Sequence, residues 1–307
     1  MTRTTRRGHR RSGSLRDMDP DVRVRSISDR TGLEALTALF MRVWRAGQPQ
    51  VPLPVLRALS HTGGMVLGAY AAGQLVGGAV GLCGADPARR GLHSHIVAVD
   101  SAARRTGVGT AIKLAQRDWC LTRGITTMTW TFDPLIRRNA TFNIARLQAV
   151  GVAYHPDFYG PMDDGYNAGV PTDRVLVRWD LTAGSTPAGG APRAFAAGPD
   201  RTAERMPHER LHVLDIGEDG RPRRLAPLPH PPAAAPPRGP APSTETEVRL
   251  RVPGTLHRDR ELLGVWRPAL RDAMSPLLDA GYRWTGVTRD GWYVLNPCAA
   301  TPHKEYA

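Results

Sequence analysis

Two arginines and two glycines lie together in one short turn within residues 97–110, which read V-A-V-D-S-A-A-R-R-T-G-V-G-T. Residues 93–99 before the turn have β character, and apolar residues after it recur at helical spacing, which predicts a helix over 107–121. A helix N-terminus presents unpaired N–H groups and the positive end of a dipole, and both bind phosphate. Glycine lets an anion approach the backbone closely, and the arginines add charge. The sequence therefore predicts a phosphate or diphosphate site at this turn.

This turn does not fit the common nucleotide-binding loops, because it lacks G-x-x-x-x-G-K-[ST] and its glycines are not spaced as G-x-G-x-x-G. The pattern V-x-V, four residues, then R-x-x-G-x-G at 104–109 resembles the acyl-CoA-binding motif of the GNAT superfamily of N-acetyltransferases. The resemblance implies an α/β (α+β) GNAT fold, in which a mixed central sheet is flanked by helices and its central strand pair is splayed. It also implies that the open strand edge pairs with the pantetheine arm of acyl-CoA while the turn amides hold the pyrophosphate. A turn that only reverses the chain is the alternative.

The residues that the resemblance assigns to acetyl-CoA or another acyl-CoA are Val97, Val99, Arg104, Arg105, Thr106, Gly107, Val108, Gly109, Thr110 and Asn139. Asn139 falls where relatives keep an asparagine that bonds the cofactor arm, and a helix cap is its alternative role.

A second resemblance involves Asp133-Pro134-Leu135, Arg138-Asn139-Ala140 and the motif N-x-G-x-P-T-D-R at 167–174. These residues resemble an uncharacterised subgroup of predicted acetyltransferases, and the resemblance covers about residues 22–181. Within the motif, Asn167, Asp173 and Arg174 are the candidate substrate-binding residues. Asp173 suits an ammonium and Arg174 a carboxylate, as in an amino acid. Alternatively, these two residues pair only to order the loop.

Acyl transfer from a thioester to an amine needs a proton acceptor, an oxyanion donor and a proton donor for the thiolate. His93 falls where some relatives hold a glutamate base, and a neutral imidazole with a pKa near ~6.5 suits that role. By resemblance, a backbone N–H near Val97 or Val99 is the oxyanion donor. Many relatives place a tyrosine acid in the helix after Asn139, but Arg146 stands there. Tyr159 is therefore the candidate acid, with Tyr154 or water as alternatives. The alternative for His93 is a strand histidine held by a hydrogen bond, and the alternative for the tyrosines is that they are core or loop aromatics without a catalytic role.

The composition limits the function classes. No apolar run is long enough to span a membrane, and the Arg-rich start has no apolar segment after it, so neither an anchor nor a secretory signal is expected. The three cysteines are far apart, which favours a reducing cytoplasm and predicts no metal site. The net charge of +13 comes largely from arginine without an aromatic-interleaved stripe, so we do not expect nucleic-acid binding.

Changes in composition divide the 307 residues into five predicted segments. Residues 1–21 form a disordered Arg-rich tail, and the resemblance assigns 22–181 to a GNAT acyltransferase domain. Residues 182–245 form an Ala/Pro/Gly-rich linker with a strand pair near 211–216 and 224–228. A small strand–helix–hairpin module covers 246–297, with its helix interrupted by Pro268 and Pro276, and 298–307 form a second tail. Such a small module is expected to pack on the first domain or on a second subunit.

The sequence thus predicts an acyl-CoA-dependent N-acyltransferase, acting with an acetyl or a succinyl donor on a small amine such as an amino acid. A non-catalytic acyl-CoA sensor and a protein N-acetyltransferase remain the alternatives, and a homodimer is left open.

Overall fold

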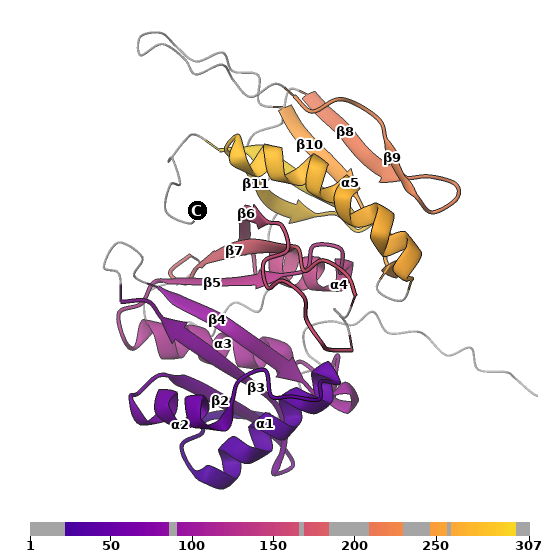
Figure 1. The fold of residues 1–307 in the computed structure, drawn as a ribbon. Helices are drawn as coiled ribbons and strands as arrows, with labels where there is room; N and C mark the ends of the chain where they lie inside the picture. The colour runs from indigo at the N-terminus through magenta and orange to yellow at the C-terminus, as the bar shows by residue number, and fades with distance from the viewer. Residues whose placement is uncertain are drawn as a thin grey trace, which may run out of the picture.

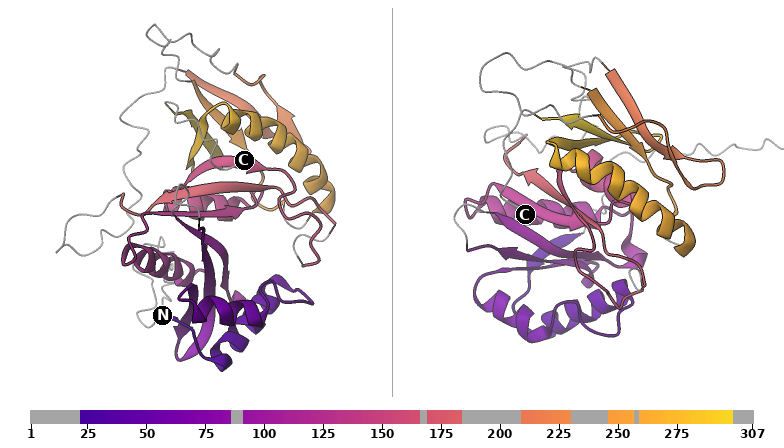
Figure 2. Two further views of the ribbon diagram at one scale, coloured as in Figure 1. Left: turned by 60° about the vertical axis from the view of Figure 1, so that its left-hand side comes forward. Right: turned by 45° about the horizontal axis from the view of Figure 1, so that its top comes forward.

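The computed structural model describes residues 22–85, 91–165, 169–183, 209–229, 246–256 and 259–298. Within these ranges, twelve strands form one sheet in the order β1-β2-β3-β4-β5-β7-β6-β11-β12-β10-β8-β9. The N-terminal strands lie at one end of the sheet and the C-terminal strands at the other, with β5 and β7 between them (Figures 1 and 2). The predicted α/β fold with helices on a mixed sheet is confirmed. The predicted tails, 1–21 and 298–307, lie outside the described residues except for Cys298.

The first end of the sheet contains four strands and two helices. Their bounds are β1 (Arg23–Ser26), α1 (Arg30–Trp44), α2 (Leu53–His61), β2 (Met65–Ala71), β3 (Gln74–Cys83) and β4 (Leu92–Val99). Asp29 begins α1, because its carboxylate accepts a hydrogen bond from the Gly32 amide at 2.8 Å. The side chains of Leu33, Leu36 and Phe40 face the sheet and join a core that includes Val80 and Ile96.

Next along the chain come a short helical turn, the central helix and the strands that form the middle of the sheet. Its elements are η2 (Ser101–Ala103), α3 (Val108–Leu121), β5 (Thr127–Phe132), α4 (Arg137–Ala140), η3 (Thr141–Arg146), β6 (Val150–His155) and β7 (Arg174–Asp180). The segment η3 is a π-helix, a rare form that occurs frequently at functional sites. β7 lies between β5 and β6 and is antiparallel to both.

The C-terminal end of the sheet is built from β8 (Glu209–Ile216), β9 (Pro222–Arg224), β10 (Thr246–Arg251), α5 (Arg260–Asp279), β11 (Tyr282–Val287) and β12 (Trp292–Pro297). The predicted strand pair near 211–216 and 224–228 is present, but its second strand is shorter and earlier than predicted. The expectation that prolines interrupt the helix is wrong, because α5 continues through Pro268 and Pro276. Its buried stripe, which includes Trp266, Leu270 and Met274, outweighs the backbone hydrogen bonds that proline removes.

A single pairing, Trp284 opposite Gly151, joins β11 to β6 and makes the sheet continuous. A side chain at position 151 would place its Cβ 2.8 Å from the Trp284 Cβ, so glycine is required for this contact. Trp284 is fully buried and belongs to a core that runs from Met65 to Leu295. The C-terminal strands and α5 therefore share one hydrophobic core with the middle of the sheet. Across the described part of the chain, we find no helix with the length and apolar character needed to cross a membrane.

Candidate functional site

The two central strands separate after a short contact. β4 and β5 run parallel and pair only through Leu92 with Met128 and His93 with Thr129, and Figure 1 shows them diverging beyond that point. The edge of β4 that faces β5 therefore has no strand partner among the described residues from Ser94 to Val99. Val97 and Val99 lie on this open stretch and are half-buried. An edge with free N–H and C=O groups can pair with an extended ligand.

A bulge lies directly beside the end of the strand contact. Val80 of β3 pairs with Ile96 and Gly81 with Ser94, so His95 is an extra residue in β4 without a partner in β3. Such a bulge turns the backbone groups of β4 relative to the neighbouring strand at the point where the split begins.

The open edge leads into the arginine–glycine turn. Arg105 has a φ of 70° and Gly107 a φ of 93°, so the backbone reverses twice in left-handed conformations before α3 begins. Gly107 is the N-cap of α3 and supplies no side chain to cap it, whereas Asp29 and Asp259 cap α1 and α5. The first amides of α3 are consequently available to a ligand.

The residues of this turn divide into exposed and buried groups. Arg104 and Arg105 are exposed, while the Thr106 hydroxyl donates to the Ala103 carbonyl at 2.8 Å. Val108 and Thr110 are only 1% and 3% exposed, so they can offer a ligand their backbone but not their side chains. A Cβ at Gly109 would have no neighbour closer than 3.8 Å, so there is room beside the helix terminus. This arrangement fits the diphosphate of acyl-CoA.

The helix after β5 contains the predicted cofactor asparagine. Asn139 is half-buried inside α4, whose N-cap is Ile136, so the alternative role as a helix cap is wrong. One turn later, the Asn143 side chain accepts a hydrogen bond from Trp130 Nε1 at 3.1 Å and ties η3 to β5. The Nε of Arg146 is buried without a hydrogen-bond partner among the described residues.

His93 lies at the closed end of the split. Its Nδ1 is 3.2 Å from the Thr129 hydroxyl, so the two side chains occupy the same face of the sheet. Burial, together with the nearby His95 and Lys113, lowers the pKa of His93 to about 4. The expectation of a pKa near ~6.5 is therefore wrong. The imidazole is neutral at physiological pH and keeps a lone pair, but it is a weaker base than an exposed histidine.

The two candidate tyrosines have different surroundings. Tyr154 is buried and its hydroxyl donates to Asp173 Oδ2 at 2.8 Å, while burial and that carboxylate raise its pKa. Tyr159 is 38% exposed, and its hydroxyl is 3.2 Å from the Thr131 hydroxyl of β5. Thr129 and Thr131 are two residues apart on one strand and share a face, so Tyr159 lies on the same face as His93.

Of the three predicted acceptor residues, Asn167 lies outside the described residues. Asp173 and Arg174 are held by contacts within the protein. The Asp173 carboxylate is 0% exposed and accepts from Arg271 of α5 at 2.7 and 2.9 Å, from Tyr154, and from the Asp157 amide at 3.1 Å. Arg174 donates to the Asp173 carbonyl at 2.9 Å, and its guanidinium lies 5.4 Å from the Tyr159 ring centroid. These contacts favour the role of ordering the loop, with Arg271 as the partner of Asp173.

Contacts fix the segment between β6 and β7 at three points. The Gly165 amide donates to the Trp44 carbonyl at the end of α1 at 3.0 Å, and Asp173 binds α5. Tyr159 is the third point, on β5. The described parts of the segment, 156–165 and 169–173, therefore contact α1, β5 and α5, and the contact with β5 lies on the sheet face that carries His93.

Lys113 is a buried group that sequence reasoning missed. Its ammonium donates to Ser94 Oγ at 3.1 Å and lies 3.7 Å above the Trp130 ring. Gln116 completes the cluster through hydrogen bonds to Ser94 Oγ at 3.0 and 3.1 Å. The apolar stripe of the sequence placed Lys113 outside the buried face of the helix, so no local signal pointed to it.

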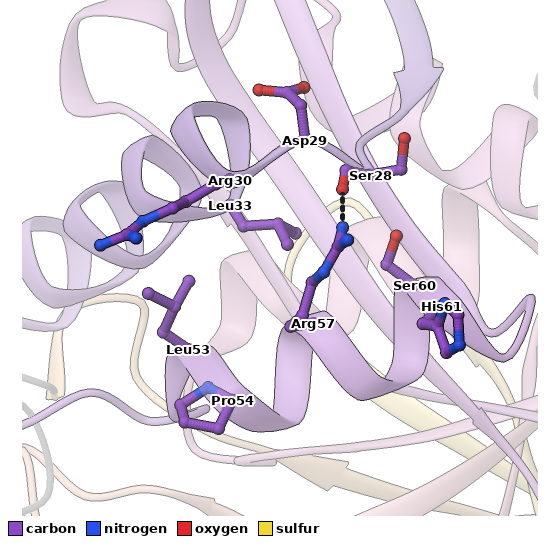
Figure 3. Close-up of a pocket in the computed structure, with 9 residues that line it drawn as sticks. All are labelled: Ser28, Asp29, Arg30, Leu33, Leu53, Pro54, Arg57, Ser60 and His61. Carbon is purple, nitrogen blue, oxygen red and sulfur yellow. Dashed lines mark hydrogen bonds between the residues drawn. The ribbon is translucent and has the colours of Figure 1, made fainter.

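An open cavity of about 830 Å³ lies elsewhere, between the start of α1 and α2 (Figure 3). Three of its polar side chains already have structural partners. Asp29 caps α1, Arg57 donates to the Ser28 carbonyl, and Ser60 donates to the Ile27 carbonyl at 2.9 Å. The cavity contains none of the predicted site residues. In the described part of the chain, no cluster of three or more His, Cys, Asp or Glu side chains could hold a metal ion.

The site therefore combines a helix terminus without a side-chain cap and an open strand edge at the split of the central sheet. Residues 2–133 match the family described as Acetyltransferase (GNAT) domain. This part of the chain is a GNAT acetyltransferase domain, and the predicted superfamily is confirmed. The predicted acyl-CoA co-substrate agrees with this membership.

Solved structures with a similar arrangement have low identity. The putative acetyltransferase yncA from Salmonella typhimurium, solved with acetyl-CoA, is 18% identical with a TM-score of 0.44 and covers 55% of this chain and 99% of its own. The ribosomal-protein-S18-alanine N-acetyltransferase from Escherichia coli is 15% identical with a TM-score of 0.42 and covers 55% and 99%. An aminoglycoside acetyltransferase from an uncultured soil metagenomic sample is 18% identical with a TM-score of 0.37 and covers 41% and 86%. No curated protein matches the chain.

Proposed function

We propose that this protein is an N-acyltransferase that transfers the acyl group of an acyl-CoA to the amine of a small molecule such as an amino acid. The observation that carries the proposal is the continuous path from the uncapped start of α3, along the open edge of β4, to the end of the split at His93. The diphosphate binds the α3 amides with Arg104 and Arg105, and the pantetheine arm follows Val97 and Val99. Asn139 of α4 bonds the same arm from the other side.

In the transfer step, the amine nitrogen attacks the thioester carbon, the C–N bond forms, and the C–S bond breaks with its electron pair leaving on sulfur. An N–H of the open β4 edge near Val97 stabilises the oxyanion. His93 takes the proton from the amine, and Tyr159 returns one to the thiolate. Both side chains contact β5 on the same face of the sheet, His93 through Thr129 and Tyr159 through Thr131.

A small acceptor is favoured over a folded protein because the β6–β7 segment is anchored to α1, β5 and α5 above this face. Arg174, the first residue of β7, directly follows that segment and would border the acceptor. Asn167, the other predicted acceptor residue in this region, lies outside the described residues. We further propose a cytoplasmic location, since Cys83, Cys120 and Cys298 are all free thiols.

Gly109→Asp tests the cofactor site with little backbone strain, since Gly109 lies within α3 and a Cβ there meets only ordinary contacts. Gly109→Ala is the matched control. We expect the Asp variant to weaken acetyl-CoA binding at least tenfold in calorimetry, because a carboxylate would face the diphosphate, while the Ala variant changes it less than threefold. Equal affinities for the two variants would contradict the proposed site.

Turnover on a panel of small amines, followed by release of free thiol from acetyl-CoA, separates the enzyme from a sensor. Binding of acyl-CoA without turnover on any amine, but with turnover on intact proteins, would instead support the protein N-acetyltransferase.

A further inference from the structure

The buried amine of Lys113 has no acidic partner among the described residues. Its side chain is only 3% exposed, and no described carboxylate forms an ion pair with it. An ammonium has three N–H donors, and the contacts that we find for it are the Ser94 hydroxyl and the ring face of Trp130. A buried charge without a counter-charge is costly and is seldom kept for packing alone.

The position of Lys113 is defined by the split between β4 and β5. The last paired residues of the two strands are His93 and Thr129. Ser94 and Trp130 are the first residues beyond that pair on each strand, and Lys113 Nζ contacts both. The ammonium of α3 therefore lies at the closed end of the split, on the side opposite His93.

The direction of the bound chain follows from the proposed function, on which this inference rests. The diphosphate lies at the start of α3 and the arm runs along β4 toward the closed end, so the acyl group is the part that reaches the end of the split. An acetyl group would leave the Lys113 charge uncompensated. An acyl group that ends in a carboxylate would bring the missing counter-charge, and its methylene groups would lie beside the Trp130 ring.

We propose that Lys113 makes the enzyme selective for an acyl-CoA whose acyl group carries a terminal carboxylate, such as succinyl-CoA, over acetyl-CoA. Ser94 supports this role because its hydroxyl holds the ammonium and is itself fixed by Gln116. Lys113 contacts the acyl group and takes no part in bond making.

The selectivity depends on pH through Lys113 itself. Burial lowers the pKa of the free Lys113 ammonium to about 7, and a bound carboxylate would raise that pKa because it stabilises the charged form. The titratable groups around it are His93 of β4, with a pKa of about 4, and Cys120 of α3, with a pKa of about 12. Of these three, Lys113 alone changes charge between pH 6 and 9. Preference for the carboxylate-bearing donor should therefore decrease as the pH rises above 7.

The test measures dissociation constants of CoA, acetyl-CoA and succinyl-CoA by calorimetry with the full chain at pH 6.5 and 8.5. The ratio of the two acyl-CoA constants is the readout, because the titration of the CoA phosphates is common to both. We expect succinyl-CoA to bind the wild type at least tenfold more tightly than acetyl-CoA at pH 6.5, with a smaller ratio at pH 8.5. Lys113→Met should bring the ratio to about one and leave acetyl-CoA affinity within twofold.

Gln116→Met is the matched control, because it disturbs the same buried cluster and leaves the charge in place. It should keep the preference for succinyl-CoA. Equal binding of the two donors by the wild type, or a preference that survives in Lys113→Met, would overturn the inference while the proposed function stands. Failure of the wild type to bind any of the three molecules would refute the proposed function instead. If Lys113→Met does not fold, the wild-type ratio and its pH dependence decide the question.

Discussion

Arg271→Met should destabilise the protein because it removes the main hydrogen-bond donor of the buried Asp173 carboxylate, which lies 98 residues away in the sequence. Asp173 is 0% exposed and accepts four hydrogen bonds, two of them from Arg271, whose side chain is 33% exposed. Burial raises the pKa of the Asp173 carboxyl, but the hydrogen bonds from Arg271, Tyr154 and the Asp157 amide outweigh it and leave the pKa lowered. The carboxylate is therefore ionised in the folded protein and needs its partners.

The expected loss follows from what remains after the substitution. Removing one partner of a buried ion pair costs about 3–5 kcal/mol. Arg271 is partly exposed and water can replace some of its contacts, so we expect a decrease in the free energy of unfolding of about 2–4 kcal/mol. Urea denaturation measures this loss. The exposed pair of Arg30 with Glu34, at 2.7 Å, provides the control, and Arg30→Met should cost less than about 0.5 kcal/mol.

A functional measurement accompanies the stability measurement. Arg271→Met should raise the KM for the amine, because Asp173 fixes the β6–β7 segment, and should leave the dissociation constant of acyl-CoA unchanged. The double variant Asp173→Asn/Arg271→Met should recover part of the lost stability, because no ionised carboxylate is then left buried. The reasoning is refuted if Arg271→Met is as stable as the wild type, or if the double variant is no better than the single one.

Three further outcomes are expected. The lowered pKa of His93 means that the unfolded chain binds a proton more readily, so His93 should lower the free energy of unfolding by about 2–3 kcal/mol as the pH drops from 6.5 to 4. In urea titrations at each pH, His93→Gln should remove this contribution and leave that of His95 and His155, whose pKa values burial also lowers. Tyr159→Phe should lower kcat about 100-fold with little loss of stability, and an unchanged kcat would exclude Tyr159 as the acid. Tyr154→Phe loses the hydrogen bond to Asp173 and should instead lower the melting temperature. Gly151→Ala should lower the free energy of unfolding by about 1–3 kcal/mol, because the added Cβ contacts Trp284 too closely. A melting temperature equal to that of the wild type would show that β6 and β11 can move apart there without loss of stability.

The arginine–glycine turn and the helix after it could be predicted from the sequence because their determinants are local. Gly107, Gly109 and the two arginines lie within six residues, and the strand before them and the helix after them have clear periodicity. The same reasoning failed where contacts are distant. Asp173 and Arg271 are 98 residues apart, and no repeat in either segment shows that they meet.

Burial was also hard to predict for polar residues on a mostly apolar helix. The stripe through Val108 and Ile112 correctly marked the inner face of α3, but Lys113 and Gln116 are buried beside it. Their burial depends on Ser94 and Trp130, which belong to two other strands. The low pKa of His93 also depends on its surroundings, because it results from burial, from His95 and from Lys113 of α3. Patterns along one segment contain no information about such neighbours.

The single pairing of Trp284 with Gly151 also has a consequence for synthesis in the cell. One of the two strands that lie beside β6 is β11, which is synthesised more than a hundred residues after β6. Until then, the apolar side of the acetyltransferase sheet around Phe132 lacks the indole that packs against it. The nascent chain must therefore keep this surface from aggregating while the ribosome completes it, and a chaperone that holds exposed strands would raise the yield of active protein.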